Sequence, residues 1–177
     1  MRSRTIRLAG ISAAIIAVAC SSDKAAAPAS TSTPATSKIV NFRATMNGAN
    51  EFPANTSTGS GAFTATLDTE TSVFTYDFTF TGLSAGVSNG HIHGPAFATG
   101  NAGTTINFNT LPGATFSFGA TSGTGRGTVT LAATTQITAA INGDSLKKLL
   151  LDGMTYVNIH TTAIPGGEIR GQITKQP

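Results

Sequence analysis

The sequence predicts an all-β domain, an antiparallel Greek-key β-sandwich or barrel with one short helix. Only 11% of the residues are charged, whereas Gly and Thr are plentiful, a composition that favours short strands joined by turns. Short stretches with strand patterns also recur along the chain, each bounded by Gly, Pro or Asn. With 177 residues, of which 40% are hydrophobic, the chain is long enough to build one domain around a real core.

The clearest strand patterns form a hairpin. In GAFTATLD, residues 61–68, alternation places Phe63, Ala65 and Leu67 on one face. In VFTYDFTF, residues 73–80, one face carries four aromatic side chains and the other carries polar ones. The link TETS between the two stretches suits a hairpin turn.

Further strands and one helix complete the predicted domain. The strands are expected at VNFRATM (40–46), TTINFN (104–109), ATFSFGA (114–120), GRGTVTLA (125–132), TYVNIHT (155–161) and GEIRGQIT (167–174). The helix is expected at GDSLKKLLLDG, residues 143–153. Asp144 or Ser145 can cap its N-terminus, and Gly153 can end it. Asn89 and Gly90 supply a further turn signal of the hairpin type.

The N-terminus reads as an export signal. Arg2, Arg4 and Arg7 precede the apolar run LAGISAAIIAVA, which ends in small residues before Cys20. Removing residues 1–19 takes away three of the 11 basic residues and none of the 8 acidic ones, which leaves 8 against 8. The mature chain is therefore formally neutral and has no basic cluster, so a nucleic-acid partner is not expected.

The stretch AVAC followed by SS resembles the lipobox of bacterial lipoproteins, although Ala17 stands where the pattern more often has Leu. The resemblance implies that Cys20 is lipidated and holds the protein to a membrane of the bacterial cell envelope. Ser21 and Ser22 imply the outer membrane, with the domain either periplasmic or exposed at the surface. The alternative is an ordinary signal peptide cleaved near Ala19, with Cys20 as a spare thiol.

The segment from Cys20 to the folded domain reads as a tether. Residues 21–38, SSDKAAAPASTSTPATSK, contain no bulky apolar side chain and are rich in Ala, Ser, Thr and Pro. Such a stretch cannot bury enough surface to offset the entropy lost on ordering. The predicted organisation is thus a signal peptide over 1–19, a disordered tether over 20–38 and one folded domain over 39–177.

All three histidines of the chain fall in two short runs. On a strand, His91 and His93 project to one face while Ile92 points the other way, and His160 shares a face with Asn158 and Tyr156. If the two strands lie close together, the imidazoles converge, and three neutral nitrogens suit copper or zinc with one position open. The alternative is that each imidazole caps a turn by bonding to backbone carbonyls.

Three blocks of the chain resemble the CHRD domain, which is named after the vertebrate protein chordin and is common in bacterial exported proteins. They are ATMNGANEFPANTSTGSGAFTATLD, FTFTGLSAGVSNGHIHGPA and LLDGMTYVNIHTTAIPGGEIRGQI, and the match runs over residues 41–173. HIHGPA and YVNIHT followed by PGGEIRGQ are the most characteristic motifs. In chordin the domain sits in an antagonist of extracellular growth factors, a role that a single-domain bacterial lipoprotein does not inherit.

A weaker resemblance links the order of these parts to copper/zinc superoxide dismutase, itself an antiparallel sandwich. It implies that His91, His93 and His160 match copper ligands and that Arg170 guides an anion to the metal. Glu168 either pairs with Arg170 beside the site or is an ordinary solvated residue. Met154 is either an additional ligand that favours copper(I) or a core residue. The chain lacks the residues that hold zinc in the dismutase and its cysteine pair, so a complete dismutase is not expected.

Three hypotheses of function follow. The first is an exported, lipid-anchored CHRD-domain protein that binds one copper ion, with zinc as the alternative, for binding, delivery or redox work. The second is a metal-free adhesion or protein-interaction module that uses its Thr-rich strands. The third, superoxide dismutase-like activity, requires turnover as well as a metal. The sequence shows no nucleophile elbow, phosphate loop or catalytic carboxylate pair, so no catalytic residue is assigned.

Overall fold

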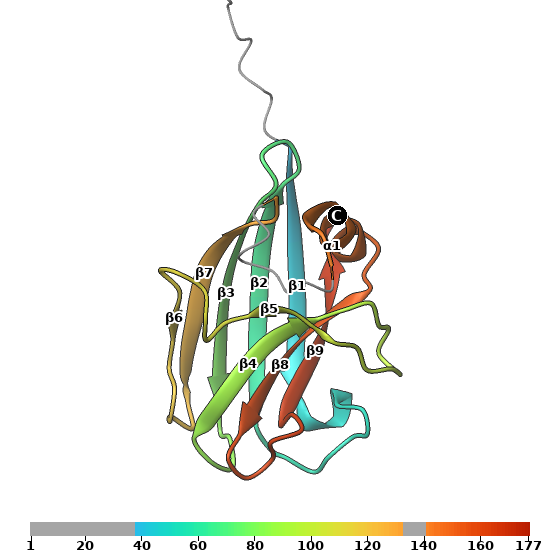
Figure 1. The fold of residues 1–177 in the computed structure, drawn as a ribbon. Helices are drawn as coiled ribbons and strands as arrows, with labels where there is room; N and C mark the ends of the chain where they lie inside the picture. The colour runs from blue at the N-terminus through green and yellow to red at the C-terminus, as the bar shows by residue number, and fades with distance from the viewer. Residues whose placement is uncertain (1–37, 133–140) are drawn as a thin grey trace, which may run out of the picture. The chain divides into compact units, whose positions relative to one another are not determined.

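The computed structural model describes residues 38–132 and 141–177. The expected signal peptide and all of the expected tether except Lys38 lie outside these residues. The described elements are β1 (Ile39–Asn47), η1 (Gly48–Asn50), β2 (Ser60–Asp68), β3 (Val73–Thr81), β4 (Val87–His93), β5 (Thr104–Asn107), β6 (Thr115–Phe116), β7 (Gly123–Thr130), α1 (Gly143–Leu151), β8 (Thr155–Thr161) and β9 (Ile169–Lys175) (Figure 1). Within the described ranges, no helix is long and apolar enough to cross a membrane.

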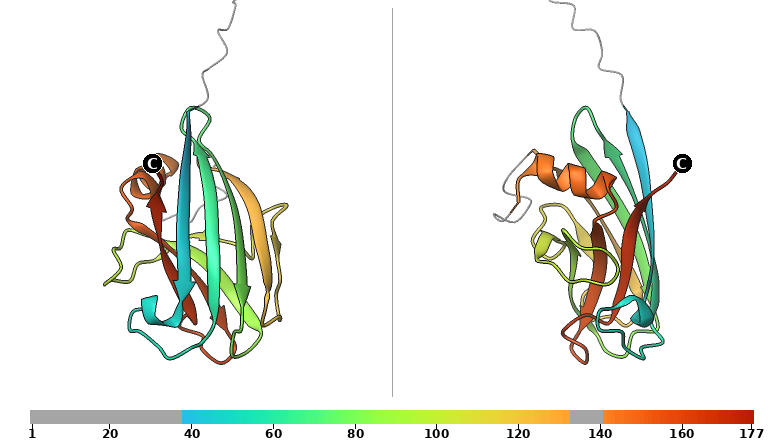
Figure 2. Two further views of the ribbon diagram at one scale, coloured as in Figure 1. Left: turned by 180° about the vertical axis from the view of Figure 1, so that it is seen from behind. Right: turned by 90° about the vertical axis from the view of Figure 1, so that its right-hand side faces the viewer.

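The strands form a single antiparallel sheet in the order β5-β4-β8-β9-β1-β2-β3-β7-β6. The sheet curls, so that β4, β8 and β9 lie in front of β1, β2 and β3 in Figure 1, and the side view in Figure 2 shows the two layers. The pairing of β1 with β9 joins the layers. The prediction of an all-β antiparallel fold with one short helix is therefore confirmed, and its two layers belong to one continuous sheet.

The core lies between these layers, because the inward residues of each strand are apolar. Phe63 and Phe78 come from one layer, Ile92, Val157 and Ile169 from the other, and all five are at most 1% exposed. The alternation read from the sequence is confirmed along β2 and β3. The buried side chains on their inward face are Phe63, Ala65, Leu67, Phe74, Tyr76, Phe78 and Phe80.

Strand β7 makes room for the aromatic side chains of β3. Its inward positions include Gly123, Gly125 and Gly127, which pair with Phe80, Phe78 and Tyr76 respectively. A Cβ atom added at Gly125 would lie 2.1 Å from Cζ of Phe78. The bare glycine backbone therefore lets each aromatic ring extend beneath the neighbouring strand, where the ring fills space that a side chain would otherwise occupy.

The helix occupies the predicted place, but its N-cap differs from the prediction. Asn142 caps it, since its side-chain oxygen accepts a hydrogen bond from the backbone N–H of Ser145 at 2.8 Å. The prediction of Asp144 or Ser145 as the cap is wrong because α1 starts at Gly143, directly after Asn142. Gly153 follows the helix with φ +70°, a left-handed conformation that suits the end of a helix.

Two turn predictions have different outcomes. The link TETS forms the turn between β2 and β3, as expected. Asn89 and Gly90, in contrast, lie inside β4, so the prediction of a hairpin turn there is wrong. A Cβ atom at Gly90 would lie 2.8 Å from Cζ of Phe116, and this glycine therefore serves a close approach to an aromatic ring.

Replacing Gly125 by Ala tests the glycine and aromatic pairing. The added methyl group overlaps the Phe78 ring, so we expect a loss of about 1–3 kcal/mol in the free energy of unfolding. Gly103→Ala is the matched control, because a Cβ atom at Gly103 has no neighbour within 4 Å. Urea unfolding of the three proteins measures the difference, and equal stability of the two variants would contradict this account of β7.

Candidate metal centre

The pairing of β4 with β8 sets the positions of the three histidines. In this register His91 faces Asn158, His93 faces Tyr156, and His160 faces Asn89. Ile92 is fully buried in the core, so the predicted division of the two faces of β4 is confirmed. The side of β4, β8 and β9 that points away from the core is here called the polar face. It carries Asn89, His91, His93, Tyr156, Asn158, His160, Arg170 and Gln172.

The three imidazoles converge on this face, as the sequence predicted. Nδ1 of His91 lies 3.0 Å from Nε2 of His160. The ring centroid of His91 is 5.2 Å from that of His93 and 4.9 Å from that of His160. One potential ligand atom from each residue lies within 4.8 Å of the others, so the cluster could hold a metal ion.

Backbone carbonyls fix the tautomers of two of the rings. Nδ1 of His93 donates to the carbonyl oxygen of Ala102 at 2.9 Å, and Nδ1 of His160 donates to that of Pro165 at 2.9 Å. A carbonyl oxygen can only accept, so each Nδ1 carries the proton and each neutral ring keeps a lone pair on Nε2. Nε2 of His93 is buried and has no hydrogen-bond partner. Two rings are therefore oriented as metal-binding histidines usually are.

Burial keeps the imidazoles neutral. Burial, together with the nearby His160 and His93 as potential like charges, lowers the pKa of His91 to about 4. Burial also lowers the pKa of His93, although its bond to Ala102 acts in the opposite direction. The pKa of His160 is lowered for the same reason and opposed by the bond to Pro165. All three rings thus offer lone pairs at neutral pH.

The loop over residues 94–103, here called the covering loop, lies against the outer side of β8 and β9 (Figure 2). Gln172 donates to the carbonyl oxygen of Ala96 at 2.9 Å, and the N–H of Ala96 donates to that of Met154 at 3.0 Å. The same loop presents the Ala102 carbonyl to His93. Its backbone therefore both shields the polar face and orients one imidazole.

Arg170 holds the covering loop in place through hydrogen bonds. Its Nη1 donates to Oδ1 of Asn101 at 2.9 Å, and its Nη2 donates to the carbonyl oxygens of Phe97 and Gly100 at 3.1 and 2.8 Å. Its guanidinium carbon lies 3.4 Å from the ring centroid of Tyr156. Only 1% of Arg170 is exposed, whereas guiding an anion needs an open approach. Its placement favours support of the site, and the guiding role stays a prediction.

Tyr156 links Arg170 to the histidines. Its ring is stacked on that of His93, with centroids 4.8 Å apart and planes inclined by 7°. The N–H of Ala102 donates to its hydroxyl oxygen at 3.4 Å. Three side chains from three neighbouring strands, Arg170, Tyr156 and His93, therefore form one continuous stack beside the cluster.

Glu168 and Met154 lie apart from this stack. Glu168 is fully buried and accepts hydrogen bonds from Ser57, Ser84 and Thr161. Burial raises the pKa of Glu168, but these bonds outweigh it and hold the pKa below its usual value. Within the described chain Glu168 forms no ion pair with Arg170, and it is buried, so it is neither the ion-pair partner nor the solvated residue considered above. Met154 is half-buried just before β8, and its role as a ligand stays a prediction.

Glu51 is a buried carboxyl group near the polar face that the sequence analysis did not find. Burial raises its pKa to about 7, although the charge of Arg170 and a contact with Asn158 act to lower it. Oε1 of Glu51 and Oδ1 of Asn158 are buried and have no hydrogen-bond partner. The Ala102 and Pro165 carbonyls were also missed, because a backbone oxygen leaves no mark on residue type. The available signal for Glu51 was its position in the first CHRD-like block, as an acidic residue in a stretch that is otherwise mostly uncharged.

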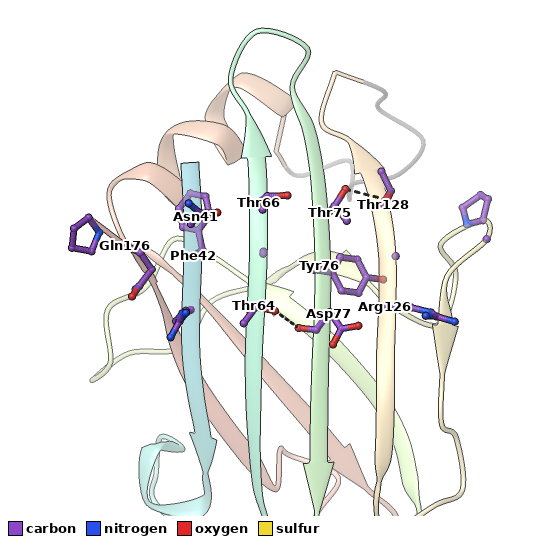
Figure 3. Close-up of a pocket in the computed structure, with 16 residues that line it drawn as sticks. Asn41, Phe42, Thr64, Thr66, Thr75, Tyr76, Asp77, Arg126, Thr128 and Gln176 are labelled. Carbon is purple, nitrogen blue, oxygen red and sulfur yellow. Dashed lines mark hydrogen bonds between the residues drawn. The ribbon is translucent and has the colours of Figure 1, made fainter. Parts of the chain in front are cut away.

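A wide groove in the described structure lies away from the histidines. It has a volume of about 870 Å³ and runs over the outer side of β1, β2, β3 and β7 (Figure 3). Its floor carries Thr64, Thr66, Thr75 and Thr128, and the last two are hydrogen-bonded through their hydroxyl groups at 3.2 Å. None of the three histidines lines it.

Comparison with known proteins agrees with the resemblance seen in the sequence. The profile of the CHRD domain family matches residues 42–173, which include every strand that carries the histidine cluster. No curated protein and no solved structure matches the chain. Because the matched region covers well over half of the sequence, the chain belongs to the CHRD domain family.

Proposed function

We propose that this protein binds one copper ion through His91, His93 and His160, for copper binding, delivery or redox work. The observation that carries the proposal is the convergence of three neutral imidazoles whose ligand atoms lie within 4.8 Å of one another. In a chain with three histidines in all, residues 69 positions apart meet at one point.

The contacts with backbone carbonyls fit both a capping role and a metal site, but the unpartnered Nε2 of His93 favours the metal. Capping needs only one nitrogen of each ring, and Nδ1 of His93 and Nδ1 of His160 provide it. A role limited to capping leaves Nε2 of His93 buried without a hydrogen-bond partner, and this costs free energy unless a ligand binds there. A metal ion accepts that lone pair.

Copper is favoured over zinc by the ligand set. Imidazole nitrogens bind both metals, and divalent copper is bound more tightly than zinc by a given set of nitrogen ligands. Three protein ligands leave one coordination position for water or a substrate. When bound, copper would supply one-electron chemistry, while His93 and His160 remain fixed by the carbonyls of Ala102 and Pro165.

The copper site is proposed to lie in the bacterial cell envelope. The basic start, the apolar run and the lipobox-like AVAC support export and lipidation of Cys20. Ser21 and Ser22 support retention at the outer membrane. The partner of the chain is then the membrane, reached through the lipid at Cys20, and the folded domain stands off from it on residues 21–38.

A second candidate, a metal-free adhesion or interaction module, is favoured by the groove in Figure 3. Its floor is rich in threonine hydroxyl groups, with Arg126 and Asp77 beside them. Such a surface can bind polar partners. It is also the usual solvated face of an antiparallel sheet, so the copper proposal ranks first.

Copper titration tests the three-histidine site directly. We expect one copper per chain with nitrogen hyperfine splitting in electron spin resonance. His91→Ala, His93→Ala and His160→Ala should each weaken binding by more than about 100-fold, because each removes a ligand. Asn89→Ala is the matched control, since Asn89 lies on the polar face beside the cluster. In the interaction-module alternative, copper does not bind and His91→Ala instead lowers stability by about 1–3 kcal/mol.

The pH dependence of copper binding tests the lowered pKa values. Protons compete with copper for imidazole nitrogens, so an ordinary site loses affinity as the pH falls below about 6.5. Here the pKa of His91 is about 4 and the pKa values of His93 and His160 are also lowered, so we expect the affinity for copper to begin to fall at a pH clearly lower than 6.5. Competition titrations at a series of pH values measure the affinity for copper. A peptide of residues 89–96, with unshifted histidines, should weaken from pH 6.5, and the same onset in the protein would contradict the proposal.

Cys20→Ser tests the lipid anchor. In a bacterial host, we expect the unaltered chain to incorporate labelled fatty acid and to partition into detergent, because a diacylated cysteine is strongly apolar. The Cys20→Ser chain should remain in the aqueous phase, whereas Ser21→Ala should behave like the unaltered chain. Equal partitioning of the cysteine variant and the unaltered chain would support an ordinary signal peptide.

A further inference from the structure

Arg170 is a buried positive charge that forms no direct ion pair with a carboxylate in the described part of the chain. It is 1% exposed, and its hydrogen-bond acceptors are two backbone carbonyls and the side-chain amide oxygen of Asn101. A buried and unpaired charge is costly, so its retention beside a candidate ion site calls for a reason.

The two nearby carboxyl groups do not cancel this charge. Glu51 interacts electrostatically with Arg170, but its pKa of about 7 leaves it only partly ionised at neutral pH. Glu168 is ionised, yet its oxygens accept hydrogen bonds from Ser57, Ser84 and Thr161 and make none with Arg170. The polar face therefore keeps a positive bias near the histidines.

Stacking brings the charge close to the cluster. The guanidinium carbon lies 3.4 Å from the Tyr156 centroid, and that ring lies 4.8 Å from the ring of His93. Both aromatic side chains are at most 9% exposed, so little water stands between Arg170 and the centre to screen the charge.

We propose that Arg170 shifts the relative affinity of the three-histidine centre away from divalent ions and toward copper(I), an inference that rests on the metal site proposed above. The three imidazole ligands are neutral, so the bound ion keeps its full charge and is repelled by Arg170. A divalent ion meets twice the repulsion of copper(I) at the same distance. A divalent ion carries one unit of charge more than copper(I). With an effective dielectric constant of about 20, the repulsion of that extra charge by Arg170 across the stack lowers the affinity for the divalent ion about tenfold relative to copper(I).

Two substitutions of Arg170 separate its charge from its structural contacts. Arg170→Gln removes the charge, and Arg170→Lys keeps it, while both lose the guanidinium fork and its stacking on Tyr156. For each purified protein, competition against a chromogenic chelator under reducing, oxygen-free conditions gives the copper(I) dissociation constant. Competition against a zinc-binding dye gives the zinc(II) constant. The selectivity is the ratio of the zinc(II) constant to the copper(I) constant.

We expect the selectivity of Arg170→Gln to fall about tenfold relative to the unaltered protein. The selectivity of Arg170→Lys, which keeps the charge, should stay close to that of the unaltered protein. A purely structural role predicts a different result, in which both variants weaken both ions to the same extent and the ratio stays constant. That constant ratio would overturn the inference.

Glu51→Gln gives a second test that leaves the contacts of Arg170 in place, and it decides the question if the Arg170 variants do not fold. At pH 8, above the Glu51 pKa of about 7, this substitution removes a negative charge that offsets Arg170. We expect selectivity for copper(I) to rise several-fold at pH 8. An unchanged or lower ratio there would refute the inference. If the unaltered protein binds neither ion, the three-histidine site itself fails, which is a separate result.

Discussion

The register of β4 against β8 is the constraint on which the site depends. It places His160 beside Asn89, two positions along the ladder from the pair of His91 and Asn158. A slip of one residue would turn the histidines toward the core and Ile92 toward solvent. The buried Ile92, Val157 and Ile159 oppose such a slip, so the apolar core that stabilises the fold also aligns the three histidines.

The same sheet has two different outer faces. Over β1, β2, β3 and β7 the outward side chains line an open groove, as is common for antiparallel sheets. Over β4, β8 and β9 the covering loop buries Tyr156 and Arg170. Burial is the main cause of the lowered histidine pKa values, so the covered half of the sheet favours the neutral form of the imidazoles.

The sequence predicted the parts of the site that depend on local periodicity. Alternation along a strand was enough to place His91 and His93 together and Ile92 in the core. The sequence could not show that β8 lies beside β4, so the convergence of His160 with the other two histidines was predicted only on that condition. Strand order in a sheet whose neighbours are not consecutive in sequence follows from long-range packing. The orienting carbonyls of Ala102 and Pro165 carry no residue-type signal. The cap was predicted at Asp144 or Ser145 and is Asn142, because the start of the helix was placed too late.

The stack of Arg170, Tyr156 and His93 explains why the covering loop and the histidine cluster form one unit. Arg170 binds the loop through Phe97 and Gly100, and the loop in turn binds His93 through Ala102. Ordering the loop therefore orders the imidazole, and a group bound to Nε2 of His93 would in return stabilise the closed loop. Arg170, the buried charged residue, thus also holds the covering loop that shields the polar face from water. The covering loop and the stack both contact His93, so the proposed effect on ion selectivity and the burial of the histidine cluster depend on one side chain, that of Arg170.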